Sequence, residues 1–158
     1  MEGDVNCSPS DLVIRAIDTS DIAPILTIQS TCPEIAQWTR RDYERVALGE
    51  MAGWVVTEGE RIAGFLVARI VLDEMEILNL AVEPGCRRRG AASGLLQEAL
   101  RWGSARRAEK AHLEVRASNL AALKFYECHG FAATGRRPRY YSAPIEDALL
   151  LAVTLPGS

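Results

Sequence analysis

The chain has 158 residues, of which 48% are hydrophobic and 25% charged, and its formal net charge is −3 at pH 7. This composition is that of an ordinary globular protein, so it excludes a disordered or fibrous chain. The net negative charge excludes nucleic-acid binding through the overall field of the protein, and any anion site must be local.

Cysteine spacing and hydropathy narrow the class further. The four cysteines form no C-x-x-C pair and have no metal-ligand spacing to a histidine. We therefore expect reduced thiols, no structural metal and a cytoplasmic location. No apolar run approaches the ~20 residues that cross a bilayer, so no membrane association is expected. The polar, acidic residues 1–10 predict a flexible tail without a signal peptide.

Hydrophobic periodicity and turn residues predict the elements of the first half of the chain. They are a strand over 12–17, a helix from the caps at 18–21 to about Ser30, a helix from Thr39 to about Gly49, and strands over 52–57, 62–72 and 74–82.

The second half predicts two helices that alternate with strands. The helices cover about 90–107 and 119–129, and the strands cover 112–116, about 131–136 and 147–154. Gly130 lies where a left-handed residue ends a helix, and Phe131 follows as its hydrophobic partner. The order β-α-α-β-β-β-α-β-α-β-β predicts a mixed α/β fold, with helices on both faces of one twisted sheet.

The loop CRRRGAASGL, residues 86–95, joins an apolar strand to a helix. The first N–H groups of a helix lack intrahelical partners and bind phosphate well. Gly90, Ala91 and Ala92 would let the backbone approach a bulky ligand, while Arg88 and Arg89 can add charge-assisted bonds. A solvated basic loop remains the alternative. The loop lacks the Lys-Ser/Thr pair of a nucleoside-triphosphate site and the G-x-G-x-x-G of a dinucleotide site.

Residues 87–92, RRRGAA, resemble the Q/R-x-x-G-x-G/A signature of the GNAT acetyltransferase superfamily. The resemblance implies acetyl-CoA as cosubstrate, with Arg88, Arg89, Gly90, Ala91, Ala92 and Ser93 at its pyrophosphate. It also implies that the backbone of Leu80, Ala81 and Val82 holds the acetyl-pantetheine arm. The fold it implies is one domain over 11–158, with about seven strands, a splayed middle pair and about four helices.

A second pair of segments, LEVRASN at 113–119 and FYECHGF at 125–131, resembles one branch of that family closely. This branch is the RimI-like ribosomal-protein-alanine N-terminal acetyltransferases, and the strong resemblance covers about 74–154. It implies that Glu114 is the general base, Tyr126 the general acid and Asn119 a cofactor contact. The implied partner is a protein N-terminus, possibly basic and ribosomal, with no direct nucleic-acid contact.

Each site residue has a plainer alternative. Glu114 alternates with apolar neighbours and could be an ordinary outward-facing strand residue. Tyr126 could be a core aromatic, although it lies about two helical turns after Asn119 and shares its face. The acidic strand start at 73–76 could be solvated or could attract a basic peptide. Cys86 has no histidine near it in sequence that would support a nucleophilic role.

The chain also departs from the family pattern. Ala92 adds a methyl group where glycine is common, and residues 32–46 differ from the expected substrate-side region. The leading prediction is transfer of acetyl to a protein α-amine, and the first alternative is a small-molecule amine or a lysine side chain as acceptor. A non-catalytic acetyl-CoA-binding module, or nucleic-acid binding by the arginine run, would be a different class of function.

Overall fold

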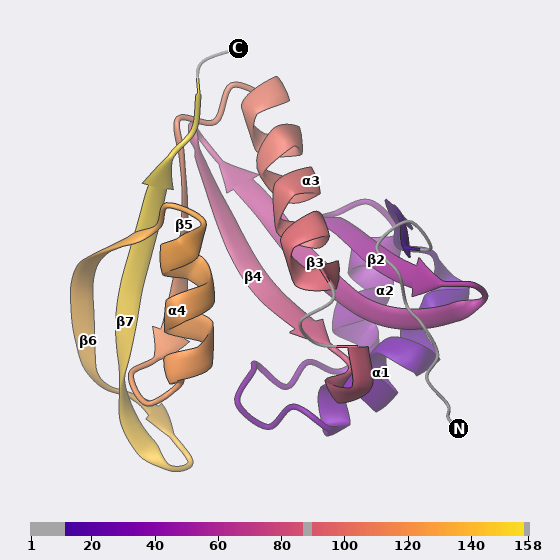
Figure 1. The fold of residues 1–158 in the computed structure, drawn as a ribbon, viewed down its shortest axis with the longest axis horizontal. Coiled ribbons are helices and arrows are strands. Elements are labelled where there is room, and N and C mark those ends of the chain that lie inside the picture. Colours follow the sequence, from indigo (N-terminus) through magenta and orange to yellow (C-terminus); the bar gives the residue numbers. More distant parts are fainter. Residues whose placement is uncertain (1–11, 87–89, 157–158) are drawn as a thin grey trace. The chain divides into compact units, whose positions relative to one another are not determined.

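The computed structural model describes residues 12–86 and 90–156. The elements in chain order are β1 (Leu12–Ala16), η2 (Thr19–Asp21), α1 (Ile22–Ser30), α2 (Arg40–Ala47), β2 (Ala52–Glu58), β3 (Arg61–Val71), β4 (Glu74–Val82), η3 (Pro84–Cys86), α3 (Ala91–Ala105), β5 (Lys110–Arg116), α4 (Leu120–Cys128), β6 (Ala132–Ser142) and β7 (Ile145–Thr154) (Figure 1). This is the predicted order, with two short 3-10 turns added.

The strands form one seven-stranded sheet in the order β1-β2-β3-β4-β5-β7-β6. Strands β1 to β3 pair antiparallel, whereas β4 and β5 run parallel and are joined through α3. The β4–β5 pairing comprises Glu74–Lys110, Met75–Ala111 and Glu76–His112, although β4 continues to Val82. The mixed sheet predicted from the sequence is therefore confirmed, and the short pairing agrees with a splayed middle pair.

By its contacts the chain divides into two compact units. The first unit comprises Met1–Arg69 and Leu78–Trp102, and the second comprises Ile70–Ile77 and Gly103–Ser158. Strand β4 therefore contributes its beginning to the second unit and its end to the first.

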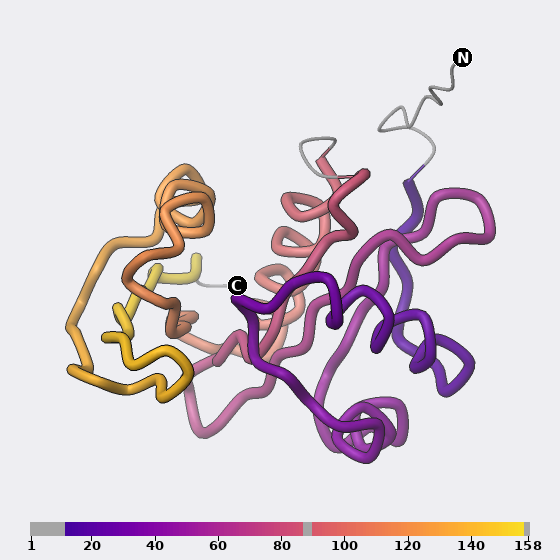
Figure 2. Tube along the Cα trace, turned by 90° about the horizontal axis from the view of Figure 1, so that it is seen from below, coloured from indigo at the N-terminus to yellow at the C-terminus, as the bar shows by residue number. Residues whose placement is uncertain are grey.

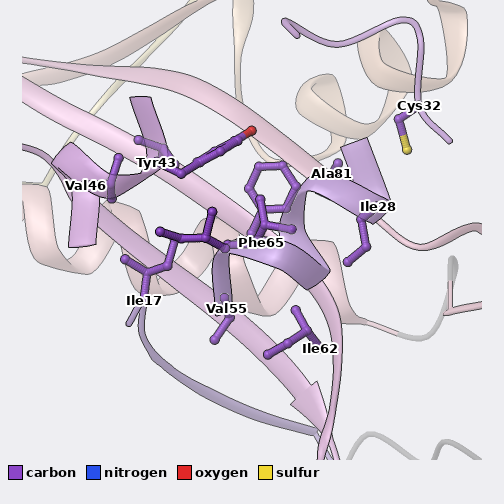
Figure 3. Packing of buried hydrophobic residues seen from close by; sticks show 12 residues of the cluster. Ile17, Ile28, Cys32, Tyr43, Val46, Val55, Ile62, Phe65 and Ala81 are labelled. Atoms are coloured by element: carbon purple, nitrogen blue, oxygen red, sulfur yellow. The ribbon is translucent and has the colours of Figure 1, made fainter. Parts of the chain in front are cut away.

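The first unit has an apolar core between its helices and strands. Tyr43, Phe65 and Val55 are completely buried and belong to one cluster with residues of α1 and α2 (Figure 3). Burial of a side chain such as Phe65 contributes about 1.5–3 kcal/mol to stability. Helix α3 covers the opposite face, where Trp102 packs on Trp54 with ring centroids 5.4 Å apart (Figure 2).

A buried hydrogen-bond network crosses the core of the first unit. The Tyr43 hydroxyl donates to the Gln29 side chain and accepts from the Asn79 amide at 3.2 Å. Asn79 also donates to the Ala36 carbonyl at 3.0 Å, and Gln29 exchanges two bonds with the Trp38 backbone. The network therefore ties the α1–α2 connection to β4 with its buried polar groups satisfied.

In the second unit, α4 ends in the predicted way. Gly130 has φ +91°, and its N–H donates to the Glu127 carbonyl, while the Phe131 N–H donates to the Tyr126 carbonyl. These two bonds are those of a Schellman motif. The Phe131 and Tyr126 rings also pack 5.4 Å apart, which supplies the hydrophobic contact that accompanies this motif.

The last two strands are longer than predicted. Strand β6 runs to Ser142 rather than about Arg136, and β7 begins at Ile145 rather than Asp147. Pro138 lies inside β6, although proline cannot donate to a strand ladder. The structure accommodates it in an irregular segment, after which pairing to β7 resumes at Tyr141.

Candidate active site

In the first unit, the end of β4 lies tight against β3. The Glu83 N–H donates to the Ala63 carbonyl at 2.7 Å. A Cβ atom at Gly64 would lie 2.8 Å from the carbonyl oxygen of Ala81, so only glycine allows this approach. Ala81 and Val82 are buried, whereas Leu80 is half-buried. The backbone of the predicted pantetheine strand is thus held in place by its neighbour.

Gly90 forms the entrance to α3. Its φ is +86°, which favours glycine, and its carbonyl accepts the Gly94 N–H at 2.9 Å. No atom of the described residues, apart from the chain neighbours of Gly90, lies within 4 Å of its Cβ position. Ala91, Ala92 and Ser93 form the first turn of α3, where backbone N–H groups lack intrahelical acceptors. The predicted phosphate contacts of Arg88 and Arg89 lie outside the described residues.

Cys86, just before the arginine run, is buried and lies against a group of charged side chains. The Arg61 guanidinium lies 2.9 Å from the Cys86 sulfur and 2.8 Å from the Glu83 carboxylate. Only 1% of Cys86 is exposed, so its thiol is not open to a substrate. Its contacts join the beginning of the loop to β3 and β4.

In the second unit, Glu114 lies on β5 and lines a pocket. The pocket is also lined by Glu76 of β4, His112 of β5, Thr134 of β6 and Leu150 of β7. The Glu114 side chain is 23% exposed, and its Oε2 lies 2.9 Å from Nε of Arg137. Glu114 is therefore not a freely solvated strand residue.

Tyr140 is a second partner of Glu114. Its hydroxyl donates a hydrogen bond to the Glu114 carboxylate, which raises the pKa of Tyr140 because the protonated form is favoured. The guanidinium of Arg137 lies 5.6 Å from the centre of the Tyr140 ring. The resemblance also covers residues 136–141, which include Arg137 and Tyr140, but it does not assign them as partners of Glu114.

A bulge in β6 separates Arg137 from Tyr141 and contains Tyr140. Arg137 lies opposite Ala148 and Tyr141 lies opposite Glu146, so residues 138–140 of β6 face Asp147 alone. The Asp147 carboxylate accepts the Arg139 N–H at 2.9 Å and binds Nε of Arg136 at 2.6 Å. These bonds lower the pKa of Asp147, the backbone bond from Arg139 having the largest effect. Bulges commonly redirect side chains.

Tyr126 is buried in α4. The centroid of its ring lies 5.1 Å from that of Phe125 and 5.4 Å from that of Phe131. Burial raises the pKa of its hydroxyl above the ordinary value. Among residues 12–86 and 90–156, none forms a hydrogen bond with that hydroxyl. A buried phenol without a hydrogen-bond partner among the described residues is unusual.

Asn119 is the N-cap of α4, where its Oδ1 accepts the Ala122 N–H at 3.2 Å. Its amide nitrogen is left for another acceptor. Beside it, the Ser118 N–H donates to the Glu146 carboxylate at 2.6 Å, and Arg116 lies 3.2 Å from the same carboxylate. These bonds lower the pKa of Glu146, the bond with Ser118 first. The start of α4 is thus tied to the β6–β7 hairpin.

The acidic start of β4 is partly neutralised. Glu74 lies 3.6 Å from the Lys110 ammonium and 3.4 Å from His112. Because Glu74 has basic neighbours, the negative charge offered to a peptide is smaller than the run of acidic residues in the sequence suggests.

The structure therefore places the predicted site residues in two sets. Leu80 to Val82 and Gly90 to Ser93 lie in the first unit, and Glu114, Asn119 and Tyr126 lie in the second. No hydrogen bond between described residues joins the Glu114 carboxylate to the Tyr126 hydroxyl. Sequence reasoning missed Arg137 and Tyr140 as partners of Glu114, and the proline inside a strand was the available signal of a bulge.

The described part of the chain contains no cluster of three or more His, Cys, Asp or Glu residues arranged to hold a metal ion. Among the same residues, no helix is both long and apolar enough to span a membrane.

The chain matches the family described as Acetyltransferase (GNAT) family over residues 21–131. It is 28% identical over 144 residues to the [ribosomal protein bS18]-alanine N-acetyltransferase of Escherichia coli K12, covering 90% of this chain and 97% of the relative. It is 37% identical over 102 residues to the enzyme of the same name from Salmonella typhimurium, covering 63% of this chain and 69% of the relative.

Solved structures agree with these relatives. The E. coli ribosomal-protein-S18-alanine N-acetyltransferase matches with a TM-score of 0.83 and 28% identity, covering 93% of this chain and 96% of that one. Arabidopsis thaliana NAA60 in complex with a bisubstrate analogue has a TM-score of 0.85 at 22% identity, covering 93% and 99%, and shows the shared fold.

Proposed function

The chain belongs to the GNAT acetyltransferase family, and from this premise we propose that it transfers acetyl from acetyl-CoA to the α-amine of a protein N-terminus. The acceptor we propose is the N-terminal alanine of ribosomal protein bS18, the group named in the relatives from E. coli and S. typhimurium. Such an enzyme acts in the cytoplasm, where ribosomal proteins are made.

The cofactor contacts come from the first unit. The first-turn N–H groups of Ala91, Ala92 and Ser93 would bind the pyrophosphate together with Arg88 and Arg89. The backbone of Leu80, Ala81 and Val82 would bind the pantetheine arm. The positive φ of Gly90, +86°, and the bond from the Gly94 N–H to its carbonyl start α3 at this loop, which supports the phosphate contact. Ala92 and Ser93 are half-buried, whereas Ala91 is buried.

The acid and base come from the second unit. The acceptor nitrogen attacks the thioester carbon, Glu114 takes the proton released by nitrogen, and Tyr126 donates a proton to the sulfur as the C–S bond breaks. An α-ammonium has an ordinary pKa of about 7.7–8.0, against about 10.4 for lysine. A carboxylate therefore deprotonates the α-amine with a smaller free-energy cost, about 1 kcal/mol at pH 7.

The observation that supports this assignment most is that the second unit contains both a carboxylate and a phenol of suitable kinds. Glu114 is a half-buried carboxylate in a pocket, while Tyr126 is a buried phenol with no hydrogen-bond partner among the described residues. One is suited to accept a proton and the other to donate one. Asn119 begins the helix that carries Tyr126, and its side-chain amide nitrogen, which has no acceptor among the described residues, would bind the cofactor.

The test uses a peptide with a free N-terminal alanine, basic residues downstream and one internal lysine. The peptide is incubated with the protein and acetyl-CoA, and the acetyl group is located by fragment mass spectrometry. We expect acetyl on the α-amine alone. Acetyl on lysine, or transfer only to a free polyamine, would contradict the proposal and move the acceptor to another class of amine.

A further inference from the structure

Glu114, the carboxylate that we propose as the base, forms an ion pair with Arg137. Nε of Arg137 lies 2.9 Å from Oε2 of Glu114. The two side chains differ in exposure, since that of Arg137 is 57% exposed and that of Glu114 is 23% exposed. The guanidinium can therefore move out into water while the carboxylate stays in its pocket.

The carboxylate has a further support that does not depend on Arg137. The Tyr140 hydroxyl donates to Glu114, and Tyr140 lies on the bulge that the Asp147 carboxylate fixes through the Arg139 N–H. Removing the Arg137 head group would leave this hydrogen bond in place. Arg137 is thus the exchangeable cationic partner of Glu114, and Tyr140, which is 48% exposed, is its neutral partner.

From this arrangement we infer that Arg137 is a resident counter-ion of Glu114, which the ammonium group of the acceptor displaces on binding. The inference rests on the proposed function of Glu114. A guanidinium and an ammonium are both cationic N–H donors, so the exchange leaves the carboxylate paired before and after. An exposed ion pair contributes little stability, and its replacement is correspondingly easy.

The exchange gives the site a chemical selectivity. A cationic acceptor can compete with the guanidinium for the carboxylate, whereas a neutral nucleophile such as water cannot. While Arg137 occupies Glu114, the base is withheld from water. Without Arg137, water would attack the acetyl carbon, Glu114 would take its proton, the C–S bond would break, and the thiolate would be protonated. The products of that reaction are acetate and CoA.

The test compares Arg137→Gln with the wild type. We expect acetyl-CoA hydrolysis without acceptor to rise, and the KM of the acceptor to fall by about two- to fivefold, the range that loss of an exposed ion pair allows. We expect kcat to stay unchanged. Arg137→Lys keeps a cation and should restore low hydrolysis. Arg45→Gln removes a similar exposed pair, Arg45–Glu50 at 2.9 Å, and serves as the control.

An independent measurement needs no acceptor. Methylguanidinium, which resembles the lost head group, should suppress the extra hydrolysis in Arg137→Gln and leave the wild type unaffected. A higher acceptor KM, a lower kcat or unchanged hydrolysis in Arg137→Gln would overturn the inference and make Arg137 a support of Glu114. If the proposed function is wrong, the wild type will not acetylate an α-amine. The comparison of acetyl-CoA hydrolysis between the wild type and Arg137→Gln would still decide the role of Arg137.

Discussion

The two units hold their site residues by different kinds of interaction. In the first unit, β4 is fixed by apolar packing and by the buried Gln29–Tyr43–Asn79 network. In the second unit, the residues around Glu114 are held largely by ion pairs and backbone bonds at an exposed hairpin. Buried interactions are little affected by salt or pH, whereas exposed ion pairs depend on both.

This difference suits the two proposed tasks. A cofactor common to many enzymes can be bound by a rigid backbone, which needs no adjustment between substrates. An acceptor site must exchange charged partners, and exposed ion pairs can open and close at low free-energy cost. Variants in each unit therefore probe different properties, namely cofactor affinity and stability in the first and proton transfer in the second.

The largest effect is expected for Glu114→Gln. Loss of a general base lowers turnover by about 100- to 10,000-fold, while acetyl-CoA affinity should change little because Glu114 is not one of the proposed cofactor contacts. Steady-state kinetics and calorimetry check the two parts separately. Turnover equal to that of the wild type would remove Glu114 from the mechanism and leave it as a strand residue.

Tyr126→Phe should lower turnover by roughly 100-fold, in the range for a general acid. Because the hydroxyl has no hydrogen-bond partner among the described residues, its removal should leave the free energy of unfolding nearly unchanged. The rate and the denaturation midpoint are measured on the same preparation. A large loss of stability would show that the hydroxyl has a structural partner.

Gly90→Asp tests the first unit. It places bulk and negative charge beside the proposed pyrophosphate site, so the Kd of acetyl-CoA should rise roughly 10- to 100-fold, as expected when a charge-assisted contact becomes repulsive. Gly49→Asp is the matched control, because Gly49 also has a positive φ, +94°, and open space around its Cβ position. Equal affinities for the two variants would move the phosphates away from Gly90.

The first-unit network predicts a change in stability. Tyr43→Phe removes the hydroxyl that donates to Gln29 and accepts from Asn79, leaving two buried amides without that partner. We expect a loss of about 1–3 kcal/mol in the free energy of unfolding. Urea unfolding measures it, and a loss that varies strongly between low and high salt would contradict the contrast between the units.

The sequence predicted the structure well where neighbouring residues determine it, as in helix caps and in the hydrophobic periodicity of strands. The caps at Asp18, Thr39 and Gly130 and the periodicity of β4 predicted element ends to within a few residues. The same patterns could not predict the bulge at 138–140, because its geometry depends on Asp147 in another strand. The partners of Glu114 were missed for this reason, since contacts across strands are set by register and not by neighbouring residues.

The smallest change in stability is expected at Asp147, and its size depends on pH. Hydrogen bonds from Arg139 and Arg136 lower the pKa of Asp147 in the folded state. Its contribution to stability is therefore fully present above the unfolded value of about 3.9 and is lost as the pH falls through the lower folded value. Asp147→Asn should thus be less stable than the wild type near pH 7, and the difference should shrink in acid.

Unfolding curves at pH 7 and pH 3 measure this difference, and Tyr43→Phe is the comparison, since neither Tyr43 nor its amide partners titrate in that range. If Asp147→Asn loses the same free energy at both pH values, the carboxylate acts through packing and not through charge. Uncharged contacts would then hold the bulge, as they hold the Gln29–Tyr43–Asn79 network in the first unit. The β6 bulge beside Glu114 would keep its conformation when the pH changes, and the exchange of cations at Glu114 would take place next to a rigid hairpin.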